Sequence, residues 1–395
     1  MIGMGRGQGR GQGRGQGRGQ GRGQGRGQGG SAGDHAGGGA SALLSSALTS
    51  THGALVSNWD PDNPKFTHAI MKYGGDTADI KYLEGENRGL LLTALMVAQF
   101  AVDGPGKAGE ETDEFNYSAG IHVRDGTGSF LVGRPSVAFL KQQLKFLRSY
   151  ADLRDDRLAE IVAQKDDLLS FFGAVCHLDA GRRKHTLAFL DVVQSAVIQL
   201  EMQIKHYCLR PRPNYLASQI QPMIQTPDHS TYPSGHAIEA FALATVLHYL
   251  MTPDKTDDDR SAVGGVSACA LPFRLAARIA VNRTVAGVHY PVDSLVGAQI
   301  GCFLGQAMLV QSGVDFGVGH GPVEHRTALD DSSGMHGATE GGFSDLDDFL
   351  LSTFSKKPDL ALPLFPMPVP GQVNGILAAA FGEVLKEWDT TAWDE

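Results

Sequence analysis

Cysteine is scarce in this 395-residue chain, and its four cysteines stand far apart, at Cys176, Cys208, Cys269 and Cys302. No pair has the Cys-x-x-Cys spacing, so the sequence indicates neither a zinc site nor the dense disulfide framework of a small secreted protein. We expect reduced thiols packed in an apolar interior. The hydrophobic content of 42% is typical of a globular protein with its own core.

Long apolar runs are lacking as well. The most apolar stretches, near residues 89–102, 237–251 and 294–310, are short or interrupted by Gln, Glu or Gly. A helix that spans a bilayer needs about 20 apolar residues, so we expect buried helices of a soluble protein and no membrane span. The N-terminus has no charged start followed by an apolar core and a small-residue cleavage site, which favours a cytoplasmic location.

No run of residues alternates between apolar and polar clearly enough to predict a strand. In the first half of the chain, apolar residues instead recur at spacings of three and four, as in Val137, Leu140, Leu144 and Leu147. This spacing indicates amphipathic helices. The segment 103–135, rich in Gly and Asp, is expected to be a long loop between helices. The predicted fold class is therefore all-α.

The segment Gly5–Gln28 repeats the tetrapeptide Gly-Arg-Gly-Gln and contains neither apolar nor acidic residues. Nothing in it can offset the entropy of ordering, so we predict a disordered tail. Its six arginines could contact nucleic acid, although a low-complexity extension without a ligand is the simpler explanation. Without them, 28 Lys and Arg face 43 Asp and Glu, a formal charge of -15 for the body. Such a body should repel nucleic acid.

The hexapeptide Thr231–His236, with the sequence TYPSGH, stands directly before the apolar run 237–250. Taken alone, it is typical of the capped start of a buried helix. A helix N-terminus also offers free backbone N–H groups and a partial positive charge, which together bind anions. A histidine there could exchange protons with the anion. Ser234, Gly235 and His236 are therefore candidate site residues.

Two further segments carry cations and a second histidine. Lys205 ends a long amphipathic pattern, and Arg212 follows seven residues later in a segment whose prolines prevent it from remaining helical. Arg283 precedes His289 by six residues, and Asp293 follows His289 by four. A proline between the last two suits the first turn of a helix. His289 would then lie at a helix mouth, where Asp293 could orient its imidazole.

Each of these residues alone is more often a solvated charge or a core histidine than a site residue. Their combination resembles the signature of the type 2 phosphatidic acid phosphatase and vanadium-dependent haloperoxidase superfamily: Lys-x6-Arg-Pro, then Pro-Ser-Gly-His, then Arg-x5-His-x3-Asp. One position departs from it, Asn282, where the family usually has Ser or a small residue, and no chemistry is expected of that position. The resemblance implies a helical bundle of the acid phosphatase and vanadium haloperoxidase type, in agreement with the periodicity.

The resemblance also implies a role for each matched residue. Lys205, Arg212 and Arg283 would bind the oxygens of phosphate or vanadate, and Ser234 and the Gly235 N–H would add neutral donors.

The two histidines and the aspartate would carry the chemistry. His289 would bond to phosphorus or vanadium and would be the metal ligand in a vanadium enzyme. Asp293 would keep it in one tautomer, and His236 would act as acid and base on the opposite side.

Phosphate and vanadate are both tetrahedral, so the resemblance implies two chemistries for the same residues. In a phosphatase, His289 would attack the phosphorus of a monoester, His236 would protonate the leaving alcohol, and water would hydrolyse the phosphohistidine. In a haloperoxidase, His289 would ligate vanadate, which activates hydrogen peroxide for attack by halide.

Features outside the shared core favour the haloperoxidase. His229, seven residues before His236, occupies a position where the family's bromoperoxidases resemble this chain, so we include it among the candidate catalytic residues. Against this branch, Met202 stands where the haloperoxidases would lead us to expect Trp. We predict a vanadium-dependent haloperoxidase that oxidises bromide or iodide with hydrogen peroxide and has vanadate as cofactor. The alternative is a soluble phosphomonoesterase without a cofactor.

A third hypothesis is an RNA- or protein-binding module in which the arginine-rich tail binds the partner and the body is a degenerate enzyme. The complete set of residues from Lys205 to Asp293 argues against degeneracy. We expect small-molecule substrates, namely hydrogen peroxide and halide or a phosphate ester, and nucleic acid only through residues 1–30. An exposed face of the N-terminal helices could support a homodimer.

Composition and motifs together divide the chain into four parts. Residues 1–58 form the predicted tail, 59–204 an N-terminal helical region, 205–312 the catalytic core, and 313–395 an acidic, Gly- and Pro-rich C-terminal extension. Within this extension the segment VNGILAAAFGEVLKEW could form a last amphipathic helix. We expect the extension to be peripheral.

Overall fold

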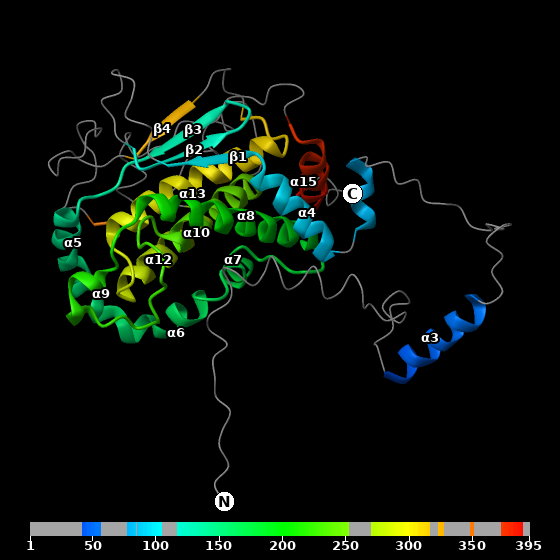
Figure 1. Ribbon diagram of the computed structural model, residues 1–395, viewed down its shortest axis with the longest axis horizontal. Helices are drawn as coiled ribbons and strands as arrows, with labels where there is room; N and C mark the ends of the chain where they lie inside the picture. The colour runs from blue at the N-terminus through cyan, green and yellow to red at the C-terminus, as the bar shows by residue number, and fades with distance from the viewer. Residues whose placement is uncertain are drawn as a thin grey trace, which may run out of the picture. The chain divides into compact units, whose positions relative to one another are not determined.

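A computed structural model describes residues 42–56, 77–83, 85–104, 117–252, 270–316, 323–327, 348–350 and 373–389 (Figure 1). Helices dominate these residues, and the predicted all-α class is confirmed. The chain has two compact units, Met1–Leu90 and Leu91–Glu395, and every candidate site residue belongs to the second. The Gly-Arg-Gly-Gln repeat lies outside the described residues.

The first unit contains helix α3 (Ala42–Val56), the 3-10 helix η1 (Thr77–Tyr82) and the start of α4 (Gly85–Val97). Helix α3 corrects the prediction that residues 1–58 are all disordered. Its sequence ALLSSALTSTHGALV is rich in Ala and Leu, which have high helix propensity. The side chains described in α3 are exposed, so none of these side chains contributes to a core.

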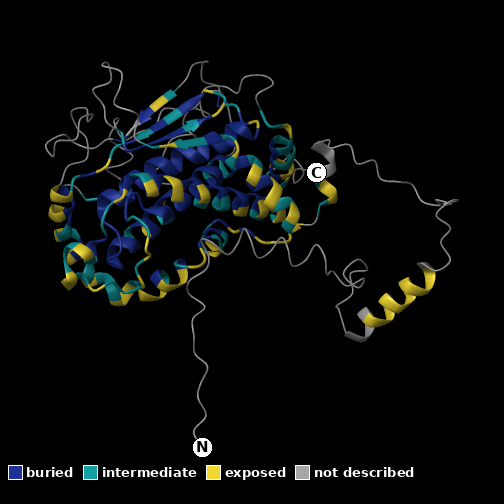
Figure 2. Cartoon of the chain, viewed as in Figure 1, coloured by how far each residue is buried: buried dark blue, intermediate teal, exposed yellow. Residues whose placement is uncertain are grey.

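The core of the second unit is the pair α10 (Gly235–Met251) and α13 (Pro291–Gln311). Figure 2 shows both helices buried along nearly their whole length. Three glycines of α13, Gly297, Gly301 and Gly305, lie against successive turns of α10. A Cβ on Gly301 would stand 2.5 Å from the Ile238 carbonyl oxygen. The helices can therefore run parallel at very short separation, with their N-termini side by side.

Further helices surround this pair. Helix α8 (Lys184–Cys208) and helix α12 (Leu271–Val285) both pack on α10. Helices α5 (Val137–Tyr150), α6 (Arg154–Gln164) and α7 (Leu169–Val175) pack on α12. The remaining short elements are η2 (Ala151–Leu153), α9 (Pro213–Leu216) and η3 (Ser218–Ile220). Helix α5 confirms the periodicity only in part, because Leu140 and Leu147 are buried whereas Val137 is 40% exposed.

The expected loop at 103–135 is wrong, because strands β2 (Ala119–Val123) and β3 (Gly128–Val132) form there. They join β1 (Phe100–Asp103) and β4 (Val323–Arg326) in a sheet of order β1-β2-β3-β4, in which β3 and β4 are parallel and the other pairs antiparallel. The signal that could have revealed the hairpin is Asp125-Gly126. Gly126 has a φ of 78°, and Asp125 Oδ1 accepts hydrogen bonds from the Thr127 N–H and hydroxyl.

The last part of the chain is less peripheral than expected. Strand β4 pairs with β3, and helix α15 (Gly375–Glu387), which confirms the predicted last helix, packs on α8. At the start of α8, the Glu387 carboxylate accepts hydrogen bonds from the backbone N–H groups of His185 and Thr186, at 2.8 and 2.9 Å. The C-terminal helix thus caps the helix that carries Lys205, because the carboxylate satisfies two of its free N–H groups.

Among the residues that the structure describes, two helical segments are long and apolar enough to cross a membrane by length and composition, Lys184–Leu216 and Pro291–Gln311. The apolar window of the second is entirely buried within the fold, and that of the first is half buried. Core helices of soluble proteins have the same property. The prediction of reduced, packed cysteines holds for Cys176, Cys208 and Cys302, which are free and buried, while Cys269 lies outside the described residues.

Candidate active site

The N-termini of α10 and α13 meet at the candidate site. The Ser234 N–H donates a hydrogen bond to the Asp293 carbonyl oxygen at 2.9 Å, which joins the two helix mouths. Ser234 and Gly235 begin α10, and His289 and Asp293 flank the start of α13. The parallel packing of these helices thus brings together motifs that stand more than 50 residues apart in the sequence.

His289 and Asp293 form a buried pair. The distance from His289 Nδ1 to Asp293 Oδ2 is 3.0 Å, and Arg212 Nη1 lies 3.2 Å from His289 Nε2. Because Arg212 can only donate, these partners assign the proton to Nδ1 and leave Nε2 unprotonated, with a lone pair that accepts from Arg212. Burial, together with the charges of Arg212 and Lys205, lowers the pKa of His289 well below its usual value. The ring is therefore a neutral imidazole whose Nε2 is nucleophilic once the Arg212 N–H turns to another acceptor, such as an oxygen of a bound anion.

Thr231 is a contributor that the sequence analysis missed. Its hydroxyl is buried and donates to Asp293 Oδ2 at 2.6 Å, and the Tyr290 N–H donates to the same oxygen at 3.0 Å. Burial raises the pKa of Asp293 to about 6, while these two hydrogen bonds oppose the rise. Thr231 stands in the hexapeptide that was singled out, but nothing in its spacing distinguishes it from other turn residues.

Lys205 and Arg212 hold the loop that precedes α10. Lys205 Nζ donates to the carbonyl oxygens of Pro233 and Ser230, and Arg212 donates to those of His229, Ser230 and Val288. Both side chains are 1% exposed. Burial lowers the pKa of Lys205 to about 8 and that of Arg212 to about 10, so both remain charged near neutral pH. They place two positive charges directly beneath the helix mouths.

Arg283 and Ser234 carry donors that no described protein atom satisfies. Arg283, on α12, uses Nη2 to donate to the Ile161 carbonyl oxygen and to Gln164 Oε1, both at 3.2 Å. Its Nε and Nη1 atoms and the Ser234 hydroxyl are buried and have no hydrogen-bond partner among the described residues. An unsatisfied buried donor costs about 1–3 kcal/mol. Such buried donors fit an anion with several oxygens.

His236 lies in the first turn of α10 and is partly exposed. Its Nε2 lies 3.0 Å from the Gln164 carbonyl oxygen, which can only accept, so Nε2 carries the proton. Nδ1 faces Glu239 Oε1 at 3.9 Å. Burial and the charge of Arg283 lower the pKa of His236 well below its usual value, which leaves Nδ1 free to accept a proton.

His229 lies against the same cluster. Its Nδ1 is 3.2 Å from Arg212 Nη2, and burial with the nearby charges of Lys205 and Arg212 lowers its pKa to about 4. It is therefore neutral near pH 7. Met202, where the resemblance would lead us to expect Trp, is 38% exposed on α8.

Two buried side chains at the site were not expected. Glu201 lies one turn before Lys205, and its carboxylate covers Gly235, where a Cβ would stand 2.5 Å from Oε1. Burial and the charge of Glu239 raise the pKa of Glu201 to about 8. Gln164, at the end of α6, contacts both Arg283 and His236. Their only sequence signal is a polar residue on the apolar face of a helix.

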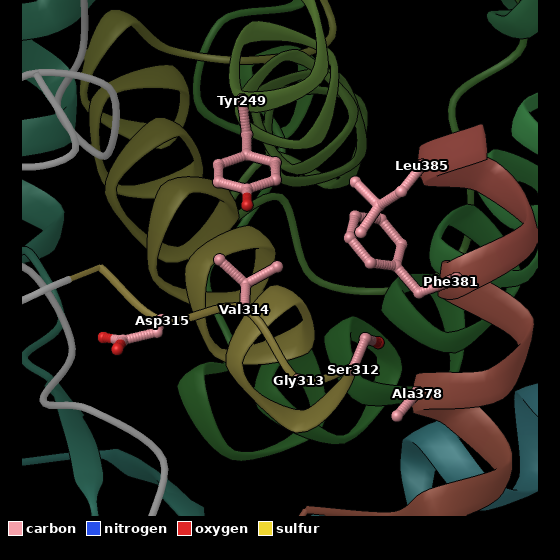
Figure 3. Close-up of a pocket in the computed structure, with 9 residues that line it drawn as sticks. Tyr249, Ser312, Gly313, Val314, Asp315, Ala378, Phe381 and Leu385 are labelled. Atoms are coloured by element: carbon pink, nitrogen blue, oxygen red, sulfur yellow. The ribbon is translucent and has the colours of Figure 1, made fainter. Parts of the chain in front are cut away.

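A cavity of about 370 Å³ lies at the opposite ends of the central helices. Figure 3 shows Tyr249 of α10 together with Phe381 and Leu385 of α15 pointing into it. Tyr249 stands 14 residues after Gly235, about 21 Å along α10 at 1.5 Å per residue. This cavity is therefore separate from the candidate active site.

Comparisons with known proteins bear on the same residues. Residues 186–315 match the model of the PAP2 superfamily. The chain is 28% identical over 138 residues to the decaprenylphosphoryl-5-phosphoribose phosphatase of two Mycobacterium tuberculosis strains, which covers 35% of this chain and 66% of that enzyme. It is 33% identical over 91 residues to the vanadium-dependent bromoperoxidase of Ascophyllum nodosum, across 19% of this chain and 16% of that protein. The family match and these relatives support a PAP2 superfamily domain within this chain.

Proposed function

We propose that the protein is a vanadium-dependent haloperoxidase that oxidises bromide or iodide with hydrogen peroxide. The observation that carries this proposal is the buried set formed by neutral His289 and the unpartnered donors of Arg283 and Ser234. His229 beside Arg212 favours the bromoperoxidase-like chemistry, as does the 33% identity to a bromoperoxidase.

Vanadate fits the residues that are present. Arg283, the Ser234 hydroxyl and the Gly235 N–H would bind its oxygens, the charges of Lys205 and Arg212 would balance its negative charge, and His289 Nε2 would bond to vanadium. When bound, vanadate activates hydrogen peroxide for attack by halide. The protein's own contribution is preorganised positive charge in a site shielded from water, where electrostatic interactions are strong.

His289 and His236 would have different roles, one as the ligand and the other as the proton acceptor. Asp293 and Thr231 hold His289 in the tautomer that keeps Nε2 unprotonated. His236, whose Nδ1 is free, would take the proton that hydrogen peroxide releases, and the Glu239 carboxylate at 3.9 Å would stabilise the resulting imidazolium.

A phosphomonoesterase is the second candidate, and the longer alignment with the mycobacterial phosphatase favours it. The same donors would bind a phosphoryl group, and His289 Nε2 would attack phosphorus as the ester oxygen leaves. His236, once it has taken up a proton at Nδ1 beside Glu239, would protonate the leaving alcohol, and water would then hydrolyse the phosphohistidine.

The two candidates are separated by assaying full-length protein with and without orthovanadate. We would measure peroxide-dependent bromination of a phenol indicator and hydrolysis of p-nitrophenyl phosphate in both samples. The haloperoxidase proposal expects bromination only with vanadate, its loss in His289→Ala, and no change in His206→Ala, which replaces an exposed histidine on α8. Phosphate release that vanadate abolishes, without bromination, would instead identify a phosphatase.

A further inference from the structure

Gln164 is the last residue of α6 and lies at the site although it belongs to none of the three motifs. Its side chain is 1% exposed. Through its side-chain oxygen it accepts from Arg283 Nη2 at 3.2 Å, and through its backbone oxygen it accepts from His236 Nε2 at 3.0 Å. It therefore lies between the cation and the histidine to which we assign oxyanion binding and proton transfer.

The orientation of the Gln164 carboxamide is fixed by its partners. Oε1 accepts from Asn282 Nδ2 at 3.0 Å as well as from Arg283. A flipped amide would place its NH2 group against two donors, so Oε1 and Nε2 are assigned without ambiguity. The consequence is that Nε2 points away from both donors.

This Nε2 atom is buried and has no hydrogen-bond partner in the described part of the chain. Arg283 Nε and Nη1, on the side chain that Gln164 contacts, share this property. Buried donors in proteins are nearly always satisfied. Gln164 and Arg283, which contact each other, thus both carry buried donors that the described protein atoms leave unsatisfied, as expected of two side chains that bind the same oxyanion.

We propose that Gln164 is a further oxyanion-binding residue, whose Nε2 donates to the same tetrahedral anion that Arg283 binds. The ligand class is a phosphate or vanadate oxyanion bonded to His289 Nε2. The inference rests on the proposed function only in requiring an oxyanion at His289, and it holds for either branch.

Asn282 explains why Gln164 takes this orientation. It is the position that departs from the family pattern. Its Nδ2 also donates to Glu160 Oε2 at 3.0 Å, and Glu160 forms an ion pair with Arg278 at 2.6 Å. A small residue at 282 would leave Gln164 Oε1 with Arg283 as its remaining donor. The side chain of Asn282 thus acts as a positioning residue for Gln164.

The test measures binding of orthovanadate and of inorganic phosphate to full-length protein by calorimetry, so that the readout is independent of turnover. Gln164→Leu should bind both anions about tenfold more weakly, the effect of losing one hydrogen bond to a charged group. Gln306→Leu is the matched control, because Gln306 is a buried glutamine on α13 far along the helix from Asp293. This variant should bind both anions with wild-type affinity. Circular dichroism checks that each variant is folded.

A second variant keeps the acceptor oxygen of the side chain and removes its donor. Gln164→Glu keeps the oxygen that accepts from Asn282 and Arg283 but replaces the donor with a negatively charged oxygen. We expect it to bind anions more weakly than Gln164→Leu. Asn282→Ala should weaken binding severalfold in the wild-type background and have no further effect in Gln164→Leu, as expected of a residue that acts through Gln164.

The outcomes are distinct. Wild-type affinity in Gln164→Leu or in Gln164→Glu overturns the inference even where bromination by the wild type supports the proposed function. Weakened binding in both variants supports the inference even where the wild type fails to brominate and the haloperoxidase proposal fails. Failure of the wild type to bind either anion overturns both.

Discussion

Ionisable side chains at the site lie where burial opposes their charge. Lys205 and Glu201, one helical turn apart on α8, illustrate this: burial lowers the pKa of the first to about 8 and raises that of the second to about 8. Near neutral pH, Lys205 keeps its proton and its charge, while Glu201 holds a proton and is neutral. The site therefore retains the net positive charge that an oxyanion requires, in spite of the carboxyl group within it.

The first residue-scale prediction concerns Thr231. Thr231→Val removes the hydroxyl that donates to Asp293 Oδ2 at 2.6 Å, and we expect activity to fall by about 10-fold or more, as for other groups that orient a ligating histidine. This hydrogen bond opposes the rise in the pKa of Asp293, so its loss raises that pKa further. The acid limb of the pH–activity profile should move to higher pH. Thr231→Ser, which keeps the hydroxyl, should retain the wild-type profile, and equal profiles for the two variants would contradict this role.

A second residue-scale prediction concerns Glu201 and the pH dependence of the free energy of unfolding. Its pKa in the folded protein, about 8, lies above the ordinary value of 4.5. The folded state therefore binds the proton more tightly, and this contribution to stability is full below about pH 4.5 and is lost as pH rises through 8. Glu201→Gln should remove this loss.

Urea unfolding between pH 5 and 8 measures the effect. The free energy of unfolding should fall more steeply with pH in the wild type than in Glu201→Gln. Asp293 titrates within this window in both proteins, and its contribution cancels in the comparison. Lys205, with a lowered pKa of about 8, titrates only at the upper limit of the window. Equal slopes in the two proteins would show that Glu201 is not perturbed by burial.

At the scale of elements, the site depends on how closely α10 and α13 approach. Gly297 lies against the Ser234 carbonyl oxygen, where a Cβ would stand 2.7 Å away, and Gly301 and Gly305 continue the contact along the next two turns. Only glycine allows the two backbones this separation. The close approach at one end fixes where Ser234 and Asp293 meet, so the spacing of these glycines sets the geometry of the site.

We predict that Gly301→Ala destabilises the protein and lowers its activity. The new Cβ would stand 2.5 Å from a backbone oxygen and 2.9 Å from the Cβ of Phe241, and overpacking of this kind costs about 1–3 kcal/mol. Gly382→Ala is the control, because a Cβ there meets no described atom within 4 Å. In a helix this change should stabilise by about 0.5–1 kcal/mol. Thermal unfolding measures both, and an unchanged Gly301→Ala would show that the helices can separate without cost.

At the scale of the whole molecule, the C-terminal elements β4 and α15 pack against the rest of the second unit. Strand β4 completes the sheet, and α15 caps α8 through Glu387 while Trp388 Nε1 donates to the Thr186 hydroxyl at 3.0 Å. The Arg183 guanidinium also lies 4.0 Å from the Trp388 ring centroid. Because α8 carries Lys205 at its other end, these contacts connect the C-terminal helix to the site through one continuous helix.

Glu387→Ala should therefore lower the free energy of unfolding by about 1–2 kcal/mol, the cost of losing a helix cap. Glu383→Ala, on the same helix, provides the comparison. The Glu383 side chain is 48% exposed and pairs with Lys386 at the surface, and such pairs contribute about 0–1 kcal/mol. Urea unfolding of both variants measures the difference. Equal losses would indicate that Glu387 acts only as a surface charge.

The arginine-rich repeat gives a prediction for the full chain. Deleting residues 1–30 removes six positive charges and leaves a body with a formal charge of -15. Any affinity for RNA should disappear with the repeat and should fall steeply with salt in the full-length protein, while catalytic rates stay unchanged. A loss of catalysis on this deletion would show that the repeat takes part in the activity.

The amino-acid sequence by itself determined the helices and the residues of the three motifs. Helical periodicity and helix-start signals are local, so they can be recognised without knowing what packs against them. Lys205, Arg212, Arg283, His289 and Asp293 do lie together in the structure, because each motif places its side chains at a helix end.

Only the tertiary structure decided what surrounds those motifs. The sheet was missed because its strands have four or five residues, too few to establish an alternating pattern, and because β4 comes from far along the chain. Gln164, Glu201 and Glu387 owe their roles to partners more than 30 residues away. A single buried polar residue on a helix has the same local signal whether it contacts a site, a helix end or another side chain. Its function is therefore decided by packing, which brings distant segments into contact and leaves no periodic trace in the sequence.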